Sequence, residues 1–235
     1  MNPALNNKTF QTVSYGDDVM TTNGVINKSF ILWLVLAAGA YLGWTNATVI
    51  MNYIWLIIIG AFALCLLIVF NLRTAPYFSP IYAFGEGLML GAITLLFEKD
   101  YPGVAVNAIF LTICDLFLML AAFKSGKIRV TKKFKKVVIL STFAICLVYL
   151  IDIILSACHI PGITFIHSSG ALGILISVFV VIIASLNLIL DFDVIQTGVE
   201  AHAPKYMEWY GAFALMVTIV WLYLEILRLL TKLRN

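Results

Sequence analysis

The sequence predicts an all-α integral membrane protein with seven transmembrane helices. Hydrophobic residues make up 62% of the 235 residues, charged residues only 11%, and the mean hydropathy is +1.01. A soluble domain of this length could not bury so much apolar surface. Seven apolar segments approach the length of about 20 residues that a helix needs to cross a bilayer, where lipid offers backbone polar groups no partners.

The seven segments follow one another along the chain after a polar start. Residues 1–28 are asparagine-rich and lack the pattern of a secretory signal, so we expect a cytoplasmic tail there and the transmembrane domain at residues 29–235. The expected spans are residues 29–44, 51–71, 78–97, 104–123, 137–157, 168–190 and 209–230.

In the third span, a pair of glycines indicates close helix packing and a pair of prolines indicates where the helix begins. Gly87 and Gly91 have the spacing of small residues that lets another helix approach closely. Pro76 and Pro80 are expected to bracket the start of the span, because proline disrupts a helix interior.

The distribution of lysine and arginine predicts the orientation. The segment KSGKIRVTKKFKK, residues 124–136, holds seven basic residues and should be cytoplasmic. With the N-terminus also cytoplasmic, eleven of the fifteen lysines and arginines face the cytoplasm. A last segment that enters the membrane and returns would raise that number, and this re-entrant alternative stays open. Because the basic loop lies against a membrane, we expect it to attract anionic lipid rather than nucleic acid.

Four acidic residues fall within the expected spans: Glu86, Asp115, Asp152 and Glu225. A charge at the bilayer centre costs about 2.5–3.5 kcal/mol, so such residues normally face a bundle interior or water and mark a pathway. Acids attract cations and hold protons, which favours these as the transported or sensed species. The alternative is structural: the acids hydrogen-bond to neighbouring helices, or Glu225 pairs with Arg228 three residues later.

Two further acids occur in the stretch LILDFDVI, at the expected cytoplasmic end of the sixth span. An acid at the water boundary costs little, so the position of Asp191 and Asp193 alone assigns them no role. Two residues apart on a helix, they point in different directions.

The chain carries no recognisable catalytic or metal-binding motif. It has no HExxH, GxSxG, P-loop or dinucleotide-binding pattern, and its four cysteines lack CxxC spacing. We therefore expect no enzymatic activity and no cofactor.

Six stretches spread over nearly the whole chain carry a family resemblance: GVINKSFILW (24–33), SPIYAFGEGLMLGAI (79–93), YPGVAVNAIFLT (101–112), FIHSSGALG (165–173), LNLILDFDVI (186–195) and APKYMEWYGAFALMVTIVWLYLEILRLL (203–230). In their order and spacing they resemble the Bax inhibitor-1-like, or transmembrane Bax inhibitor motif, family, and in particular its bacterial branch. The resemblance implies seven helices with the last one central, in a bacterial inner membrane with the N-terminus cytoplasmic.

The resemblance also implies a pH-responsive leak for Ca²⁺ or other cations, gated by two carboxylates that share a proton. By position these are Asp191, with Asp193 beside it, and Glu225, while Arg73 matches a basic residue that can pair with this sensor. Glu86, Asp115 and Asp152 are then candidates for the ion pathway.

This chain departs from the family pattern in two ways. The second acid is Glu rather than Asp, and 34 residues separate it from Asp191, so helix six must extend into the cytoplasm or an interfacial turn must follow it. The competing hypothesis is a membrane interaction protein that binds a stress-response or protease complex in the membrane and transports nothing.

Overall fold

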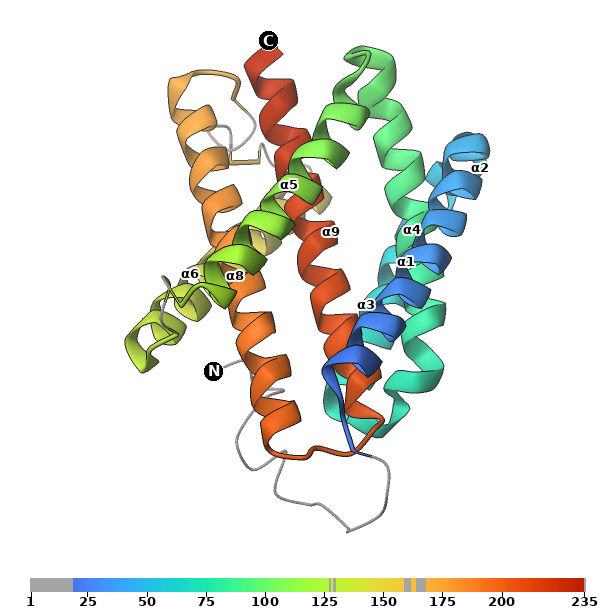
Figure 1. Ribbon diagram of the computed structural model, residues 1–235. Coiled ribbons are helices and arrows are strands. Elements are labelled where there is room, and N and C mark those ends of the chain that lie inside the picture. Colours follow the sequence, from blue (N-terminus) through green and yellow to red (C-terminus); the bar gives the residue numbers. More distant parts are fainter. Residues whose placement is uncertain (1–18, 127, 129, 159–161, 164–167, 235) are drawn as a thin grey trace. The chain divides into compact units, whose positions relative to one another are not determined.

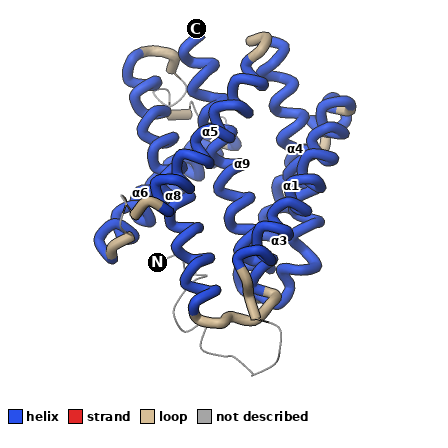
Figure 2. Tube along the Cα trace, in the orientation of Figure 1, coloured by secondary structure: helices blue, strands red, loops and turns tan. Residues whose placement is uncertain are grey.

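The computed structural model describes residues 19–126, 128, 130–158, 162–163 and 168–234 (Figure 1). The predicted tail as far as residue 18, and Lys127 and Arg129 of the basic loop, lie outside the described residues. The described residues form helices and connecting turns without any strand (Figure 2). The helices are α1 (Thr22–Thr45), α2 (Ala47–Asn52), α3 (Ile54–Phe70), η2 (Leu72–Thr74), α4 (Ala75–Asp100), α5 (Val104–Lys124), α6 (Lys132–Ala157), α8 (Ala171–Glu200) and α9 (Met207–Arg234).

Local signals in the sequence explain where several helices begin and end. Thr21 caps α1 by accepting a hydrogen bond from the backbone N–H of Gly24, and Thr131 caps α6 in the same way. Gly103, with φ of 83°, precedes α5 in a left-handed conformation that glycine adopts without strain. Pro80 lies inside α4, so the prediction that it brackets the start of that span is wrong.

Six of the described helices are long and apolar enough to cross a membrane. They are α1, α4, α5, α6, α8 and α9, with η2 continuing α4 at its start. The predicted second span, 51–71, corresponds to α3, which has only 17 residues, and its first two residues belong to α2, before the break at Tyr53. At about 1.5 Å per residue α3 is about 25 Å long, slightly less than the hydrocarbon thickness of about 30 Å.

The described chain forms two compact units, and α8 and α9 contribute to both. The first unit contains residues 19–102 and 191–217, and the second contains residues 103–190 and 218–234. Ile145, Val180 and Ile183 form an apolar core of the second unit, with Tyr149 and Trp221 packed against it.

The closest helix packing in the first unit is between α1 and α4. Gly39 of α1 lies against Gly87 of α4, and Gly43 lies against the backbone of Leu88. This confirms that the glycines of α4 admit another helix, and it identifies a matching pair on α1. Because the contact positions rise together along both helices, α1 and α4 run parallel (Figure 1). Parallel packing requires the chain to return between them, and α2 and α3 provide that return.

The ends of α8 and α9 differ from the prediction. α8 continues to Glu200, so Asp191 and Asp193 lie inside a helix and the prediction that they end it is wrong. The added turns of α8 are one of the two solutions expected for the long connection to Glu225. α9 then runs unbroken to Arg234, whereas the re-entrant alternative requires a reversal, so that alternative is wrong.

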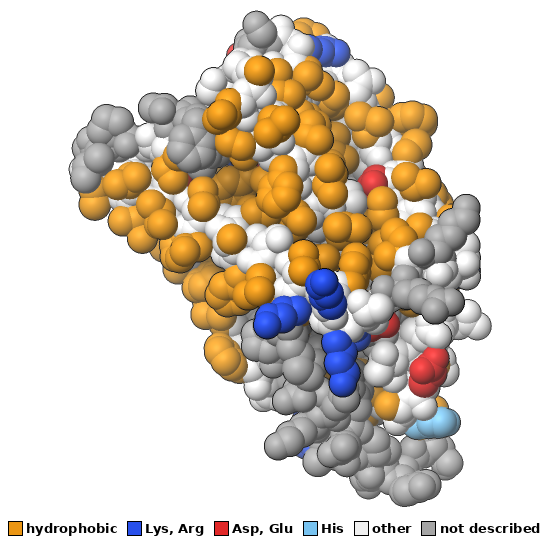
Figure 3. Space-filling model, turned by 90° about the vertical axis from the view of Figure 1, so that its left-hand side faces the viewer, with side chains coloured by type: hydrophobic (Ala, Val, Ile, Leu, Met, Phe, Trp, Pro, Cys, Tyr) orange, Lys and Arg blue, Asp and Glu red, His pale blue; other side chains and the backbone are white. Residues whose placement is uncertain are grey.

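Large apolar side chains remain exposed along most of the helices. Among them, Ile59, Phe62, Phe110, Phe117 and Phe143 are all more than 45% exposed. Hydrophobic side chains cover much of the face shown in Figure 3. Apolar helices with apolar outer faces are what an integral membrane protein needs, because hydrocarbon surrounds them.

Candidate functional site

The most deeply buried acid of the second unit is Glu225 of α9, which is 2% exposed. Tyr149 of α6 donates its hydroxyl hydrogen to the carboxylate, with distances of 2.9 and 3.0 Å to the two oxygens, and Trp221 Nε1 donates at 3.2 Å. Arg228 lies 3.3 Å from both oxygens and also donates to the Tyr149 hydroxyl at 2.8 Å. The pairing of Glu225 with Arg228, expected as the structural alternative, is confirmed.

This cluster joins two helices through charge and aromatic contacts. The guanidinium of Arg228 lies 5.0 Å from the ring centre of Tyr149, a cation–π distance. Protonation of Glu225 would remove the anion that holds Arg228, while the Tyr149 hydroxyl could still bond to the neutral acid. Protonation would therefore change which neighbours the Glu225 carboxyl group binds.

Lys232, one turn beyond Arg228, is a buried cation that no sequence pattern indicates. It is 5% exposed and donates to Ser177 Oγ at 2.8 Å and to the Gly173 carbonyl at 3.2 Å, both on α8. The last expected span ends at residue 230, so the sequence placed Lys232 beyond the membrane-spanning segment. Because α9 extends past residue 230, Lys232 lies on the helix and packs against α8. No local sequence motif predicts that contact.

The remaining predicted sensor residues lie in the first unit. Asp191 and Asp193 are half-buried on α8, and Tyr210 of α9 lies near enough to Asp191 to interact with its charge. Arg73, in η2, is exposed and makes no hydrogen bond or ion pair with any residue that the structure describes. Its pairing with the sensor therefore stays a prediction.

Two predicted pathway acids lie near hydroxyl groups on their own or neighbouring helices. Glu86 of α4 is 8% exposed and within hydrogen-bonding reach of Tyr82, one turn earlier. Tyr82 packs edge-on against Phe213 of α9, with ring centres 5.0 Å apart. In the second unit, Asp115 of α5 lies close to Ser185 of α8, and its buried Oδ2 has no hydrogen-bond partner among the described residues.

Asp152, the third predicted pathway acid, stabilises a connection. Its Oδ1 accepts a hydrogen bond of 2.8 Å from the backbone N–H of Ile163, in the segment between α6 and α8. A side chain at Gly162 would collide with the same carboxylate, since the added carbon would lie 2.6 Å from Oδ1. Asp152 thus holds the end of α6 to the chain that follows it.

An unpredicted acid, Glu208, fastens the start of α9 to the start of α1. It is 1% exposed and accepts hydrogen bonds from the backbone and hydroxyl of Thr21, both at 3.0 Å, and from Lys28 Nζ at 2.6 Å. Beside it, the N–H of Met20 donates to the Ala203 carbonyl at 2.7 Å. The sequence shows only that Glu208 is an acid in the first turn of a helix, a position that favours acids. It could not predict these hydrogen bonds, because the partners are about 180 residues away.

Replacing Glu208 by glutamine should destabilise the protein by about 1–3 kcal/mol, because a Lys28 that is only 20% exposed would lose its counter-ion. The midpoint of thermal unfolding in detergent measures this loss. Glu200→Gln on exposed α8 sequence is the matched control and should leave the midpoint unchanged. Equal midpoints for the two variants would show that the Lys28–Glu208 pair contributes no stability.

The apolar helices, their exposed hydrophobic faces and the ionisable clusters among them define an integral membrane protein of the multi-span helical class. A model of the family described as Bax inhibitor 1 like matches residues 2–235. The chain belongs to the Bax inhibitor 1 like family, which confirms the resemblance read from the sequence. No curated protein and no solved structure matches the chain.

Proposed function

We propose that this protein is a proton-responsive cation leak that conducts Ca²⁺ down its gradient. The observation that carries the proposal is the burial of the Glu225 carboxylate within α9, where Tyr149 and Arg228 bind it. Family membership supports a channel-like role. A purely structural contact in this position needs no ionisable group, since apolar residues of similar size would pack as well.

In this proposal two carboxylates respond to protons. Glu225 lies in the second unit and Asp191 in the first, and both are carried by helices, α9 and α8, that run through both units. An ionised carboxylate attracts cations, and protonation removes that attraction. Two helix arrangements that differ in proton count would then change in population with pH. The proposal needs no catalytic residue and no cofactor.

Calcium flux in proteoliposomes tests the proposal. Purified protein, reconstituted in vesicles that contain a calcium-sensitive dye, should admit Ca²⁺ several times faster than empty vesicles, at a rate that changes through an acid-to-neutral pH series. The same vesicles with an unrelated reconstituted membrane protein control for leakiness caused by insertion. Flux equal to that of empty vesicles at every pH would exclude the leak.

A second candidate function is that of a membrane interaction protein. The observation that favours it is that Glu225, Glu208 and Asp152 each hold two segments together through hydrogen bonds. Under this hypothesis the acids act as structural contacts. Their neutral variants would lose thermal stability without any pH-dependent flux to alter, and a membrane partner would co-purify in stoichiometric amount.

A further inference from the structure

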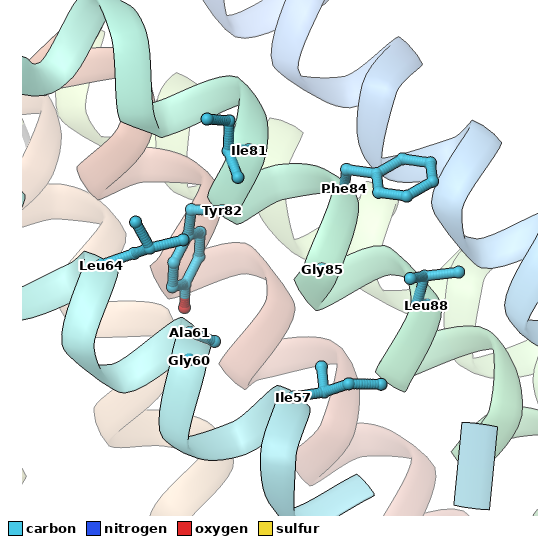
Figure 4. Close-up of a pocket in the computed structure, with 9 residues that line it drawn as sticks. All are labelled: Ile57, Gly60, Ala61, Leu64, Ile81, Tyr82, Phe84, Gly85 and Leu88. Carbon is cyan, nitrogen blue, oxygen red and sulfur yellow. The ribbon is translucent and has the colours of Figure 1, made fainter. Parts of the chain in front are cut away.

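An apolar groove of about 250 Å³ lies between α3 and α4 (Figure 4). Its walls are Ile57, Gly60, Ala61 and Leu64 of α3 and Ile81, Tyr82, Phe84, Gly85 and Leu88 of α4. The groove exists because both helices present glycine here. A side-chain carbon added to Gly60 or Gly85 would find no other atom within 4 Å. Ile68, near the end of α3, is the fully buried contact of this helix.

One face of α4 continues from the groove to a positive charge. Arg73, Tyr77, Ile81, Gly85 and Leu88 follow one another at helical spacing, three to four residues apart. Arg73 and Tyr77 are both exposed, and Arg73 has no anionic partner in the described part of the chain. The stripe is therefore charged at one end, amphipathic at Tyr77 and apolar along the groove. That order matches the headgroup, interface and tail of a phospholipid.

We infer that the α3–α4 groove binds an anionic phospholipid, with its phosphate at Arg73 and one acyl chain between Gly60 and Gly85. Along the helix the groove begins about 12 Å from Arg73 and ends about 22 Å from it, at about 1.5 Å per residue. One leaflet of hydrocarbon is about 15 Å thick, so an acyl chain anchored at Arg73 reaches into the groove.

A second copy of the chain fits the groove less well than a lipid. A stable protein interface buries about 1,200–2,000 Å², far more than the nine residues around this narrow groove provide. The groove is also continuous with the exposed apolar faces of α3 and α4, where Ile59, Phe62 and Ile81 are 55–64% exposed. Hydrocarbon already surrounds these faces in a membrane, so lipid needs no separate route to the site.

Photo-crosslinking tests this inference. Full-length protein is reconstituted in phosphatidylcholine vesicles doped with phosphatidylglycerol that carries a photoactivatable diazirine on its acyl chain, and the labelled peptides are mapped by mass spectrometry. We expect labelling of residues 57–64 and 81–88 to exceed that of other exposed helix faces several-fold. The same diazirine on phosphatidylcholine should label the groove less.

Two variants separate the headgroup from the tail. Arg73→Gln should lower the preference for phosphatidylglycerol about fivefold, the ratio that corresponds to about 1 kcal/mol for one basic residue at a membrane surface. The combined Gly60→Leu and Gly85→Leu variant should fill the groove and abolish the enriched labelling, and thermal unfolding would show that it still folds. Lys99→Gln, at the other end of α4, is the matched control for Arg73→Gln. Ala121→Leu, at an exposed position of α5, is the matched control for the glycine substitutions.

Three outcomes would overturn the inference. They are uniform labelling of all exposed faces, an unchanged headgroup preference in Arg73→Gln, and protection of the groove by a protein dimer instead of by lipid. None of these outcomes depends on ion flux, so a failure of the lipid-site inference can be distinguished from a failure of the proposed leak.

Discussion

Gly87→Ala should destabilise the protein by about 1–3 kcal/mol, although alanine is the better helix former. The added methyl group would overlap the carbonyl oxygen of Leu36 on α1 and lie 3.0 Å from the N–H nitrogen of Ala40. Both neighbours are backbone atoms, so neither can rotate away, and the two helices must move apart. Thermal unfolding in detergent, followed by tryptophan fluorescence, measures the change.

Gly85→Ala provides a control two residues away on the same helix, with the opposite expected sign. A methyl group at Gly85 meets no atom within 4 Å, so only the gain in helix propensity remains. Alanine is favoured over glycine in a helix by about 1 kcal/mol, and we expect the variant to be as stable as the wild type or more stable. Equal destabilisation at both positions would mean that helix contact between α1 and α4 is not the cause.

Asp191→Asn and Glu225→Gln should each make calcium flux at neutral pH approach the wild-type flux in acid. The amides imitate the protonated acids in shape and charge, so each variant fixes one group in its protonated state. We expect a shift of about one pH unit, or about a tenfold change in rate at a fixed pH on the steep part of the profile. Flux into proteoliposomes across a pH series measures both quantities.

The loss of charge in Glu225→Gln also affects the stability of the protein. Calcium flux through this variant and through the wild type must therefore be compared at equal amounts of folded protein. Arg228 would lose its carboxylate partner, but its side chain is 37% exposed and water compensates part of the loss. Glu200→Gln, an exposed acid on α8, should retain the wild-type profile. Unshifted pH profiles in both sensor variants would leave only the structural role for these acids.

Features that depend on local sequence were predicted well. The spacing of the glycines of α4 predicts close packing, because small residues on one face expose the helix backbone. The pairing of Glu225 with Arg228 follows from helical periodicity. Apolar runs located most of the helices. The second predicted span, 51–71, corresponds to α3, and only its first two residues lie before the turn at Tyr53, which no proline or glycine marks.

Contacts between distant segments could not be predicted. Glu208 looks like an ordinary first-turn acid until α1 brings Lys28 and Thr21 against it. The expected spans leave Lys232 beyond the last helix, but α9 continues past residue 230 and brings Lys232 against Ser177 of α8. Similarly, the prediction ended the sixth helix at Leu190 because apolarity falls there, but the helix continues past Asp191 as far as Glu200.

We propose that protonation of the carboxylates of Asp191 and Glu225 controls a cation leak, and the double variant Asp191→Asn, Glu225→Gln tests this proposal most directly. Calcium flux into proteoliposomes should occur in this variant at a rate that no longer changes between acidic and neutral pH. A double variant that keeps the wild-type pH profile would contradict the claim, because the groups that sense pH would then be elsewhere.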